Sequence, residues 1–256
     1  MSGSRPQRVL ILGGTAEARA LAAALADRGT PVVTSLAGRT TTPADLPGEL
    51  RTGGFGGPDG LVRVLQQDSI SHLVDATHPF AARIGRHAAS ACTRAGLPRL
   101  RLLRPPWRKL AGDCWHEVAG AEEAATLLPS LGRRVLLTTG QEGLPAFARV
   151  PGVQLLVRSI ERPPDLPADA AWIGARGPFR LESERSLLQN ERIEVLVSKQ
   201  SGGEATYPKI EVARQLGLPV IMLCRPEPPA GPIVETVAQA IAWLAQSDDA
   251  RAGRST

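Results

Sequence analysis

The chain has 256 residues, of which 43% are hydrophobic and 21% are charged, a balance typical of a folded globular protein. No apolar run approaches the roughly 18 to 20 residues that a membrane span needs, so no membrane association is expected. The net charge is +5, but the basic residues are scattered and aromatic residues make up only 4%, which argues against nucleic-acid binding.

The amino-terminal segment and the cysteines bear on the compartment. Residues 1–8 show no apolar signal core followed by a small-residue cleavage site, so we expect a protein that is not exported. Cys92, Cys114 and Cys224 lie far apart and form no CxxC pair, so neither a disulfide framework nor a metal site is predicted. A reducing, cytoplasmic location fits this cysteine usage.

The first half of the chain alternates short apolar runs with helical segments. Residues 9–12 are predicted to form a buried strand, and residues 16–28 a helix that ends at Gly29. The further strands expected in this half are 31–36, 72–75 and 99–103, and the further helices are 58–67 and 80–95. Repeated strand–helix units of this length predict a doubly wound α/β sheet.

The segment Arg104-Pro-Pro-Trp107 interrupts this alternation, because two prolines end regular structure, and it is the candidate domain boundary. Beyond it, strands are expected at 114–118, 135–138, 153–157, 193–197 and 220–223, and helices at 121–128, 179–189, 208–216 and 233–245. We therefore expect two Rossmann-like lobes, 1–105 and 106–246, each a parallel-rich sheet flanked by helices. A cleft is expected between them, and residues 247–256 are expected to be a frayed tail.

The turn after the first strand is a candidate cofactor site, formed by Gly13, Gly14, Thr15 and Glu17. A doubly wound fold binds nucleotide phosphate at this position, because glycine lets the backbone approach and the N–H groups of the helix start point at the anion. The full GxGxxG fingerprint is absent, since Ala18 stands where the third glycine would be sought. A merely tight turn remains the alternative.

The end of the second strand bears on the choice of cofactor. An NAD site usually has an acidic residue there to bind the ribose hydroxyls, whereas this chain has Gly38, Arg39 and Thr40. An arginine suits a 2′-phosphate that a carboxylate would repel, so NADPH is predicted over NADH. A solvated surface arginine is the alternative.

Two later loops complete the candidate site. Thr77 and His78 follow the strand at 72–75, where loops line the ligand crevice of this fold. The loop after the strand at 193–197 combines hydroxyls, glycines and a lysine before a helix start, and this is a good anion cradle although it lacks the P-loop order. Its candidate residues are Ser198, Lys199, Ser201, Gly202 and Thr206.

Five motifs in this order resemble the precorrin-6A reductase family over roughly residues 8–245. They are Leu12-Gly-Gly-Thr-Ala-Glu-Ala18, Asp75-Ala-Thr-His-Pro-Phe80, Arg104-Pro-Pro-Trp107, Ser198-Lys-Gln-Ser-Gly202 with Thr206 and Lys209, and Leu218-Pro-Val-Ile221. The resemblance implies a two-lobed reductase that transfers a hydride from NADPH to the tetrapyrrole precorrin-6A, or to its cobalt form, giving precorrin-6B. Gln200 departs from the pattern, where a smaller polar residue is expected.

The resemblance also implies roles for these residues. The first glycine turn, Thr77 with His78, and the loop from Ser198 to Thr206 should face the cleft. His78 is the candidate proton donor, and Lys199 the candidate for stabilising developing charge. The substrate carries many carboxylates, which an arginine-rich protein suits. Transient contacts with neighbouring enzymes of the pathway are also expected.

Three other functions are alternatives to the reductase. A short-chain dehydrogenase needs a Tyr-x-x-x-Lys pair, but the only tyrosine, Tyr207, is followed four residues later by Glu211. An S-adenosylmethionine-dependent tetrapyrrole methyltransferase and a non-catalytic NADP-sensing module remain open as alternatives.

Overall fold

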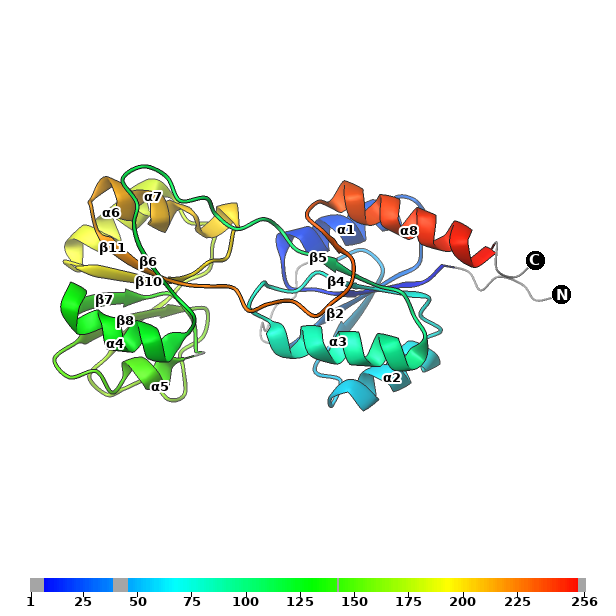
Figure 1. Ribbon diagram of the computed structural model, residues 1–256, viewed down its shortest axis with the longest axis horizontal. Coiled ribbons are helices and arrows are strands. Elements are labelled where there is room, and N and C mark those ends of the chain that lie inside the picture. The colour runs from blue at the N-terminus through cyan, green and yellow to red at the C-terminus, as the bar shows by residue number, and fades with distance from the viewer. Residues whose placement is uncertain (1–6, 39–45, 142, 253–256) are drawn as a thin grey trace. The chain divides into compact units, whose positions relative to one another are not determined.

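The computed structural model describes residues 7–38, 46–141 and 143–252 (Figure 1). The chain divides into two compact units. The first contains the chain up to Pro105 together with the segment from Glu227 onward, and the second contains Pro106–Pro226. Each unit is an α/β layer structure built on its own parallel sheet.

The sheet of the first unit contains six strands in the order β12-β5-β4-β1-β2-β3. They are β1 (Val9–Leu12), β2 (Val32–Leu36), β3 (Glu49–Thr52), β4 (His72–Asp75), β5 (Arg99–Leu102) and β12 (Ile233–Val234). Every pairing is parallel. This is the strand order of a dinucleotide-binding fold, in which the direction of winding reverses between β1 and β4. Ligands of such sheets bind beside the carboxyl ends of the two strands at the reversal.

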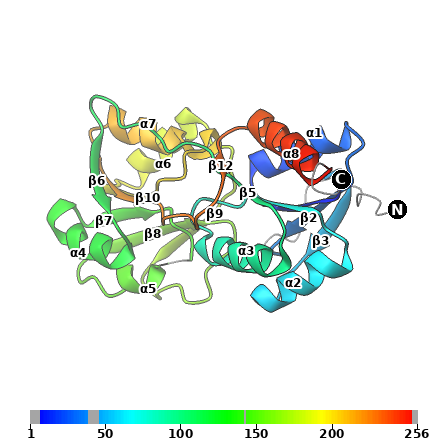
Figure 2. The ribbon, with the colours of Figure 1, turned by 45° about the vertical axis from the view of Figure 1, so that its right-hand side comes forward.

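Helices cover both faces of this sheet (Figures 1 and 2). α1 (Ala16–Ala26) and α8 (Val237–Ala252) pack on one face, and α2 (Pro58–Gln67) and α3 (Ala82–Ala95) pack on the other. Strand β1 is buried on both faces, because Val9 and Ile11 contact the α1 side while Leu10 and Leu12 contact the α2 side. A strand at the centre of the sheet therefore needs apolar residues at every position, and the run Val-Leu-Ile-Leu of β1 supplies them.

The second unit repeats this plan in the order β6-β11-β10-β7-β8-β9, again with parallel pairings throughout. The strands are β6 (Cys114–Val118), β7 (Arg134–Leu137), β8 (Gln154–Ser159), β9 (Ala171–Gly174), β10 (Val195–Lys199) and β11 (Pro219–Leu223). The helices are α4 (Ala121–Leu131), α5 (Leu144–Phe147), α6 (Leu181–Asn190) and α7 (Pro208–Gln215), with a 3₁₀ turn, η1, at Glu204–Thr206. Winding reverses between β7 and β10.

The carboxyl-terminal segment departs from its prediction. Residues 227–246, assigned above to the second lobe, lie in the first unit, where β12 pairs with β5 and the buried Ala240 and Leu244 of α8 pack in the α1 core. The predicted helix 233–245 is wrong at its start, because Ile233–Val234 is a strand. The predicted frayed tail is also wrong in part, since α8 continues to Ala252. Within the described residues, no helix is long and apolar enough to cross a membrane.

Candidate active site

The turn after β1 has the backbone geometry of a phosphate cradle. Gly13 N donates to the carbonyl of Ser35 at 2.9 Å, and a Cβ at position 13 would lie 3.1 Å from Thr34 Cγ2. Gly14 has φ +108°, and a Cβ built there would meet no described atom within 4 Å. Gly13 is thus packed against β2, while Gly14 offers open backbone at the start of α1. Phosphate groups of a nucleotide fit such a helix start.

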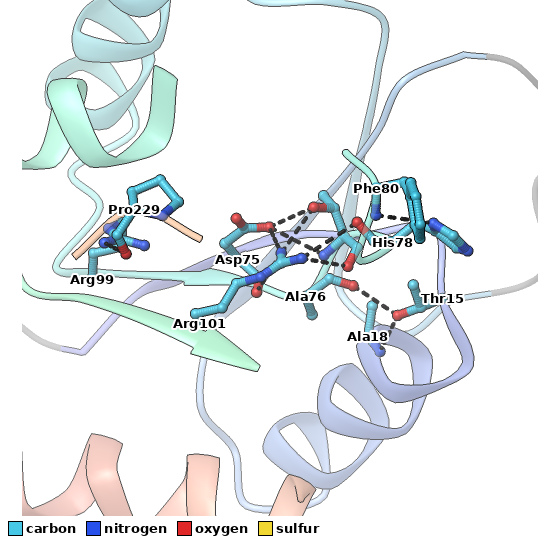
Figure 3. A network of polar contacts seen from close by, with 10 residues as sticks. Thr15, Ala18, Asp75, Ala76, His78, Phe80, Arg99, Arg101 and Pro229 are labelled. Atoms are coloured by element: carbon cyan, nitrogen blue, oxygen red, sulfur yellow. Dashed lines mark hydrogen bonds and ion pairs between the residues drawn. The ribbon is translucent and has the colours of Figure 1, made fainter. Parts of the chain in front are cut away.

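Thr15 joins the two loops that flank the reversal between β1 and β4. It is the N-cap of α1, because its Oγ1 accepts a hydrogen bond from Ala18 N at 3.1 Å. The same hydroxyl donates its proton to the carbonyl oxygen of Ala76, just after β4, at 2.7 Å (Figure 3). Since the only proton of this hydroxyl is already committed, Thr15 positions the turn rather than donating to a ligand.

A buried ion pair lies beneath the second loop. Arg101 Nη1 is 2.5 Å from Asp75 Oδ1, and the two side chains are 6% and 1% exposed. Arg101 also donates to Thr77 Oγ1 at 2.9 Å and to the carbonyls of Thr77 and His78 at 3.1 and 3.3 Å (Figure 3). Burial lowers the pKa of the Arg101 guanidinium, and the charge of Asp75 opposes that shift. A single guanidinium thus fixes the path of the chain after β4.

Thr77 and His78, both predicted site residues, lie in this fixed loop. The Thr77 hydroxyl donates to Asp75 Oδ1 at 2.7 Å and accepts from Arg101, so it belongs to the buried network. His78 Nδ1 accepts the backbone N–H of Phe80 at 3.2 Å. Because a backbone N–H only donates, the neutral ring carries its proton on Nε2. An imidazolium would need a proton on Nδ1 as well, so only the neutral ring can accept this bond.

Glu17, predicted to contact the cofactor, is held in an ion pair. Its carboxylate lies in the first turn of α1 and is 2.9 Å from Arg104 Nη1, with both side chains largely buried. A carboxylate beside a phosphate site is unfavourable unless its charge is balanced, and Arg104 supplies that balance. Arg104 therefore has a role in the site that the proline-rich motif around it did not reveal.

The remaining predicted residues of the first unit lie at the end of β2. Gly38 has φ +73°, and the described chain after β2, Ala37 and Gly38, carries no acidic side chain. Arg39 and Thr40 lie outside the described residues.

The loop after β10 stands at the corresponding reversal of the second sheet. Ser198 and Ser201 are buried, and both hydroxyls donate to the carbonyl of Lys199 at 3.3 Å. Gly202 has φ +71°, and Thr206 ends the 3₁₀ turn that follows. These groups gather in one loop of the second unit, whereas the glycine turn, Thr77 and His78 gather in the first.

Gln200 has a positioning role that sequence reasoning missed. Its Oε1 accepts the backbone N–H of Trp107 at 2.9 Å, and its Nε2 donates to the Trp107 carbonyl at 3.1 Å. Arg225 in turn donates to the Gln200 and Ser201 carbonyls at 2.7 and 3.0 Å. The amide of Gln200 thus contacts both backbone polar groups of Trp107, which a smaller hydroxyl side chain could not do.

Lys209 is a second residue that the sequence predictions left without a role. It is 4% exposed, its Nζ donates to the Thr206 carbonyl at 3.0 Å, and it lies 5.2 Å from the centre of the Trp107 ring. Burial, with a smaller contribution from Arg158, lowers the pKa of this amine to about 7, while Glu184 acts in the opposite direction. The signals available in the sequence were its place in the family motif and its rarity as one of three lysines.

The parallel sheets, the strand order and the glycine turn define a Rossmann-like class of protein. Comparison with known proteins specifies the family. A family model described as "Precorrin-6x reductase CbiJ/CobK" matches residues 8–245, and the chain belongs to this family of reductases. The resemblance drawn from the five motifs is confirmed.

Similar proteins span nearly the whole chain. A protein of Rhodococcus erythropolis named precorrin-6A reductase is 50% identical over 93% of this chain and 97% of its own length. A protein of the same name from Rhodobacter capsulatus is 42% identical over 93% of this chain and 96% of its own. A solved structure titled "CobK precorrin-6A reductase" matches with a TM-score of 0.88 and 41% identity, covering 94% of this chain and 96% of that one. The predicted fold class, two α/β lobes with parallel sheets, is confirmed.

Proposed function

We propose that this protein reduces precorrin-6A to precorrin-6B with NADPH as the hydride donor. Family membership supports the substrate, and the open glycine turn at the reversal between β1 and β4 supports a dinucleotide. The overall reaction adds a hydride and a proton across one double bond of the macrocycle and leaves NADP⁺. NADPH supplies the hydride from C4 of its nicotinamide.

The first unit is assigned to the cofactor. The backbone at Gly13 and Gly14 and the start of α1 bind the pyrophosphate, and Thr15 holds this turn against the loop after β4. Thr77 acts within the buried network that fixes the loop. We assign His78, whose Nδ1 accepts the backbone N–H of Phe80, to a hydrogen bond with the bound cofactor or substrate.

The second unit is assigned to binding the substrate and its negatively charged groups. The loop of Ser198, Ser201, Gly202 and Thr206 combines hydroxyl groups with a glycine at φ +71°, and we assign it to an anionic group of a ligand. Lys199 is assigned to stabilising negative charge that develops on the macrocycle as the hydride arrives.

The free thiols of all three cysteines fit a reducing cytoplasm.

The test is an assay of the purified protein with enzymically made precorrin-6A and, in parallel, its cobalt form. Loss of reduced-nicotinamide absorbance that requires the macrocycle, faster with NADPH than with NADH, is the expected result. A protein that binds NADPH but never oxidises it would instead be the sensing module. Methyl transfer from S-adenosylmethionine to the macrocycle, without NADPH oxidation, would establish the methyltransferase alternative.

A further inference from the structure

The end of β3 lies beside the place where this fold binds the adenosine ribose. β2 and β3 pair with Ser35 opposite Arg51 and Leu36 opposite Thr52. Gly53 N then donates to the Leu36 carbonyl at 2.9 Å, which carries the contact one residue beyond β3. In dinucleotide-binding folds the ribose 2′ position is recognised at the end of β2. Arg51 therefore stands one strand away from that position.

The Arg51 side chain is directed toward this edge of the sheet. Its guanidinium carbon lies 5.1 Å from the centre of the Phe55 ring, and Phe55 lies beyond Thr52, the last residue of β3. A guanidinium stacked on a ring that lies beyond the end of the strand must extend toward the carboxyl edge. Arg51 is half-buried, and the aromatic contact keeps its planar fork oriented.

The charge of Arg51 is not neutralised within the described part of the chain. Four other arginines of this unit each form an ion pair with an acidic residue. The pairs are Arg8–Glu49, Arg94–Asp59, Arg101–Asp75 and Arg104–Glu17. Arg51 forms no ion pair with a described residue, and its Nε is buried without a hydrogen-bond partner among them. A cation in this state favours the approach of an anion.

The glycine-rich loop after β3 leaves room for a ligand at the same place. The position of a Cβ on Gly38, just after β2, lies 3.5 Å from Gly53 N, so the two loops are in contact. Gly53 has φ +98°, and a Cβ there would meet no described atom within 4 Å. The backbones of the loops after β2 and β3 are thus closely packed where Gly38 faces Gly53, whereas the Cα of Gly53 borders open space on its other side.

We propose that Arg51, supported by Phe55, binds the 2′-phosphate of NADPH and so sets the preference for NADPH over NADH. The guanidinium matches a phosphate with two parallel hydrogen bonds, whereas the unphosphorylated ribose of NADH offers it no charge. The proposal rests on the proposed function, because it takes NADPH to be the reductant.

Calorimetric titration of the full chain with adenosine 2′,5′-bisphosphate and with 5′-AMP isolates the 2′-phosphate. The wild type should bind the bisphosphate at least about tenfold more tightly, a difference of about 1.4 kcal/mol. In Arg51→Gln most of this preference should disappear, while the affinity for 5′-AMP stays unchanged. Arg51→Lys should retain part of it, and the matched control Arg94→Gln, which alters an exposed arginine on α3, should retain all of it.

Two results separate this inference from the proposed function. If Arg51→Gln keeps the wild-type preference while the wild type oxidises NADPH with precorrin-6A, the assignment of Arg51 is wrong and the proposed function stands. If the wild type oxidises no NADPH with the macrocycle, the proposed function itself fails. Thermal melts of each variant establish that it is folded, and Arg51→Lys tests the assignment should Arg51→Gln not fold.

Discussion

Arg101 on β5 and Asp75 on β4 occupy opposite positions of two neighbouring parallel strands, and their side chains meet at 2.5 Å between Nη1 and Oδ1. The remaining donors of Arg101 are directed to Thr77 and His78 in the loop that follows β4. The pair therefore lies under the site rather than in it. A charge buried to this degree is tolerated only while its partner is present.

The first prediction concerns this pair. Arg101→Met leaves the Asp75 carboxylate buried without a counter-charge, so the free energy of unfolding should fall by about 3 to 5 kcal/mol. The measurement is urea denaturation followed by circular dichroism. Arg94→Gln, which removes an exposed pair with Asp59, should cost less than about 1 kcal/mol. Equal effects of the two substitutions would show that the buried pair has no special role.

Thr15 gives a prediction that separates its hydroxyl from its methyl group. Thr15→Ala removes the N-cap of α1 and the bond to Ala76, so it should cost about 1 kcal/mol of stability and weaken NADPH binding. Thr15→Ser keeps the hydroxyl and should behave as the wild type in both respects. Thermal melts with and without NADPH measure both effects. A Thr15→Ala protein that binds NADPH normally would contradict the positioning role.

His78 should contribute a hydrogen bond and not a titrating proton. Nδ1 accepts the backbone N–H of Phe80, a contact that only the neutral ring can make. We therefore expect His78→Ala to lower turnover while the pH dependence of kcat keeps its shape, and His78→Gln to restore part of the rate. Disappearance of one limb of the pH profile in His78→Ala would instead identify His78 as the acid.

Lys209 gives a prediction about pH and stability. Its pKa is about 7 in the folded protein, against an ordinary value of 10.5, so between these pH values the unfolded chain binds up to one proton more than the folded chain. By linkage, the contribution of Lys209 to stability rises with pH between those values, by at most about 1.4 kcal/mol per pH unit. Below pH 7 the cost of the buried charge is present in full.

The measurement for Lys209 is the difference in unfolding free energy between the wild type and Lys209→Met at several pH values. Met fills a similar volume without a charge. Lys209→Met should gain stability relative to the wild type most at pH 6, and the gain should shrink by pH 9. A difference that does not change with pH would mean that the amine titrates normally.

The strand–helix alternation was predictable because central parallel strands such as β1 and β10 are continuous apolar runs bounded by glycine or polar turns. β3 was missed because it is an edge strand whose side chains are mostly exposed, so it is not an apolar run. β9, also an edge strand, is apolar, but its four residues are too few to establish a strand period. β12 has two residues, too few for any periodicity.

The site was predictable only where a motif is local. The glycine turn lies within five residues, and its geometry follows from strand, glycine and helix start. The roles of Arg101, Arg104 and Gln200 depend on contacts between residues 24 to 93 positions apart, and such contacts follow from the strand order. The place of α8 in the first unit depends in the same way on packing between the two ends of the chain.

The central claim is that a dinucleotide bound at the Gly13–Gly14–Thr15 turn passes its hydride to a tetrapyrrole. NADPH carrying deuterium on one face of nicotinamide C4, incubated with the protein and precorrin-6A, tests it most directly. For one of the two labelled faces, we predict one deuterium in each product macrocycle for each NADPH consumed, and loss of this transfer in Gly14→Val. Product macrocycles that contain no deuterium from either labelled face would contradict the account.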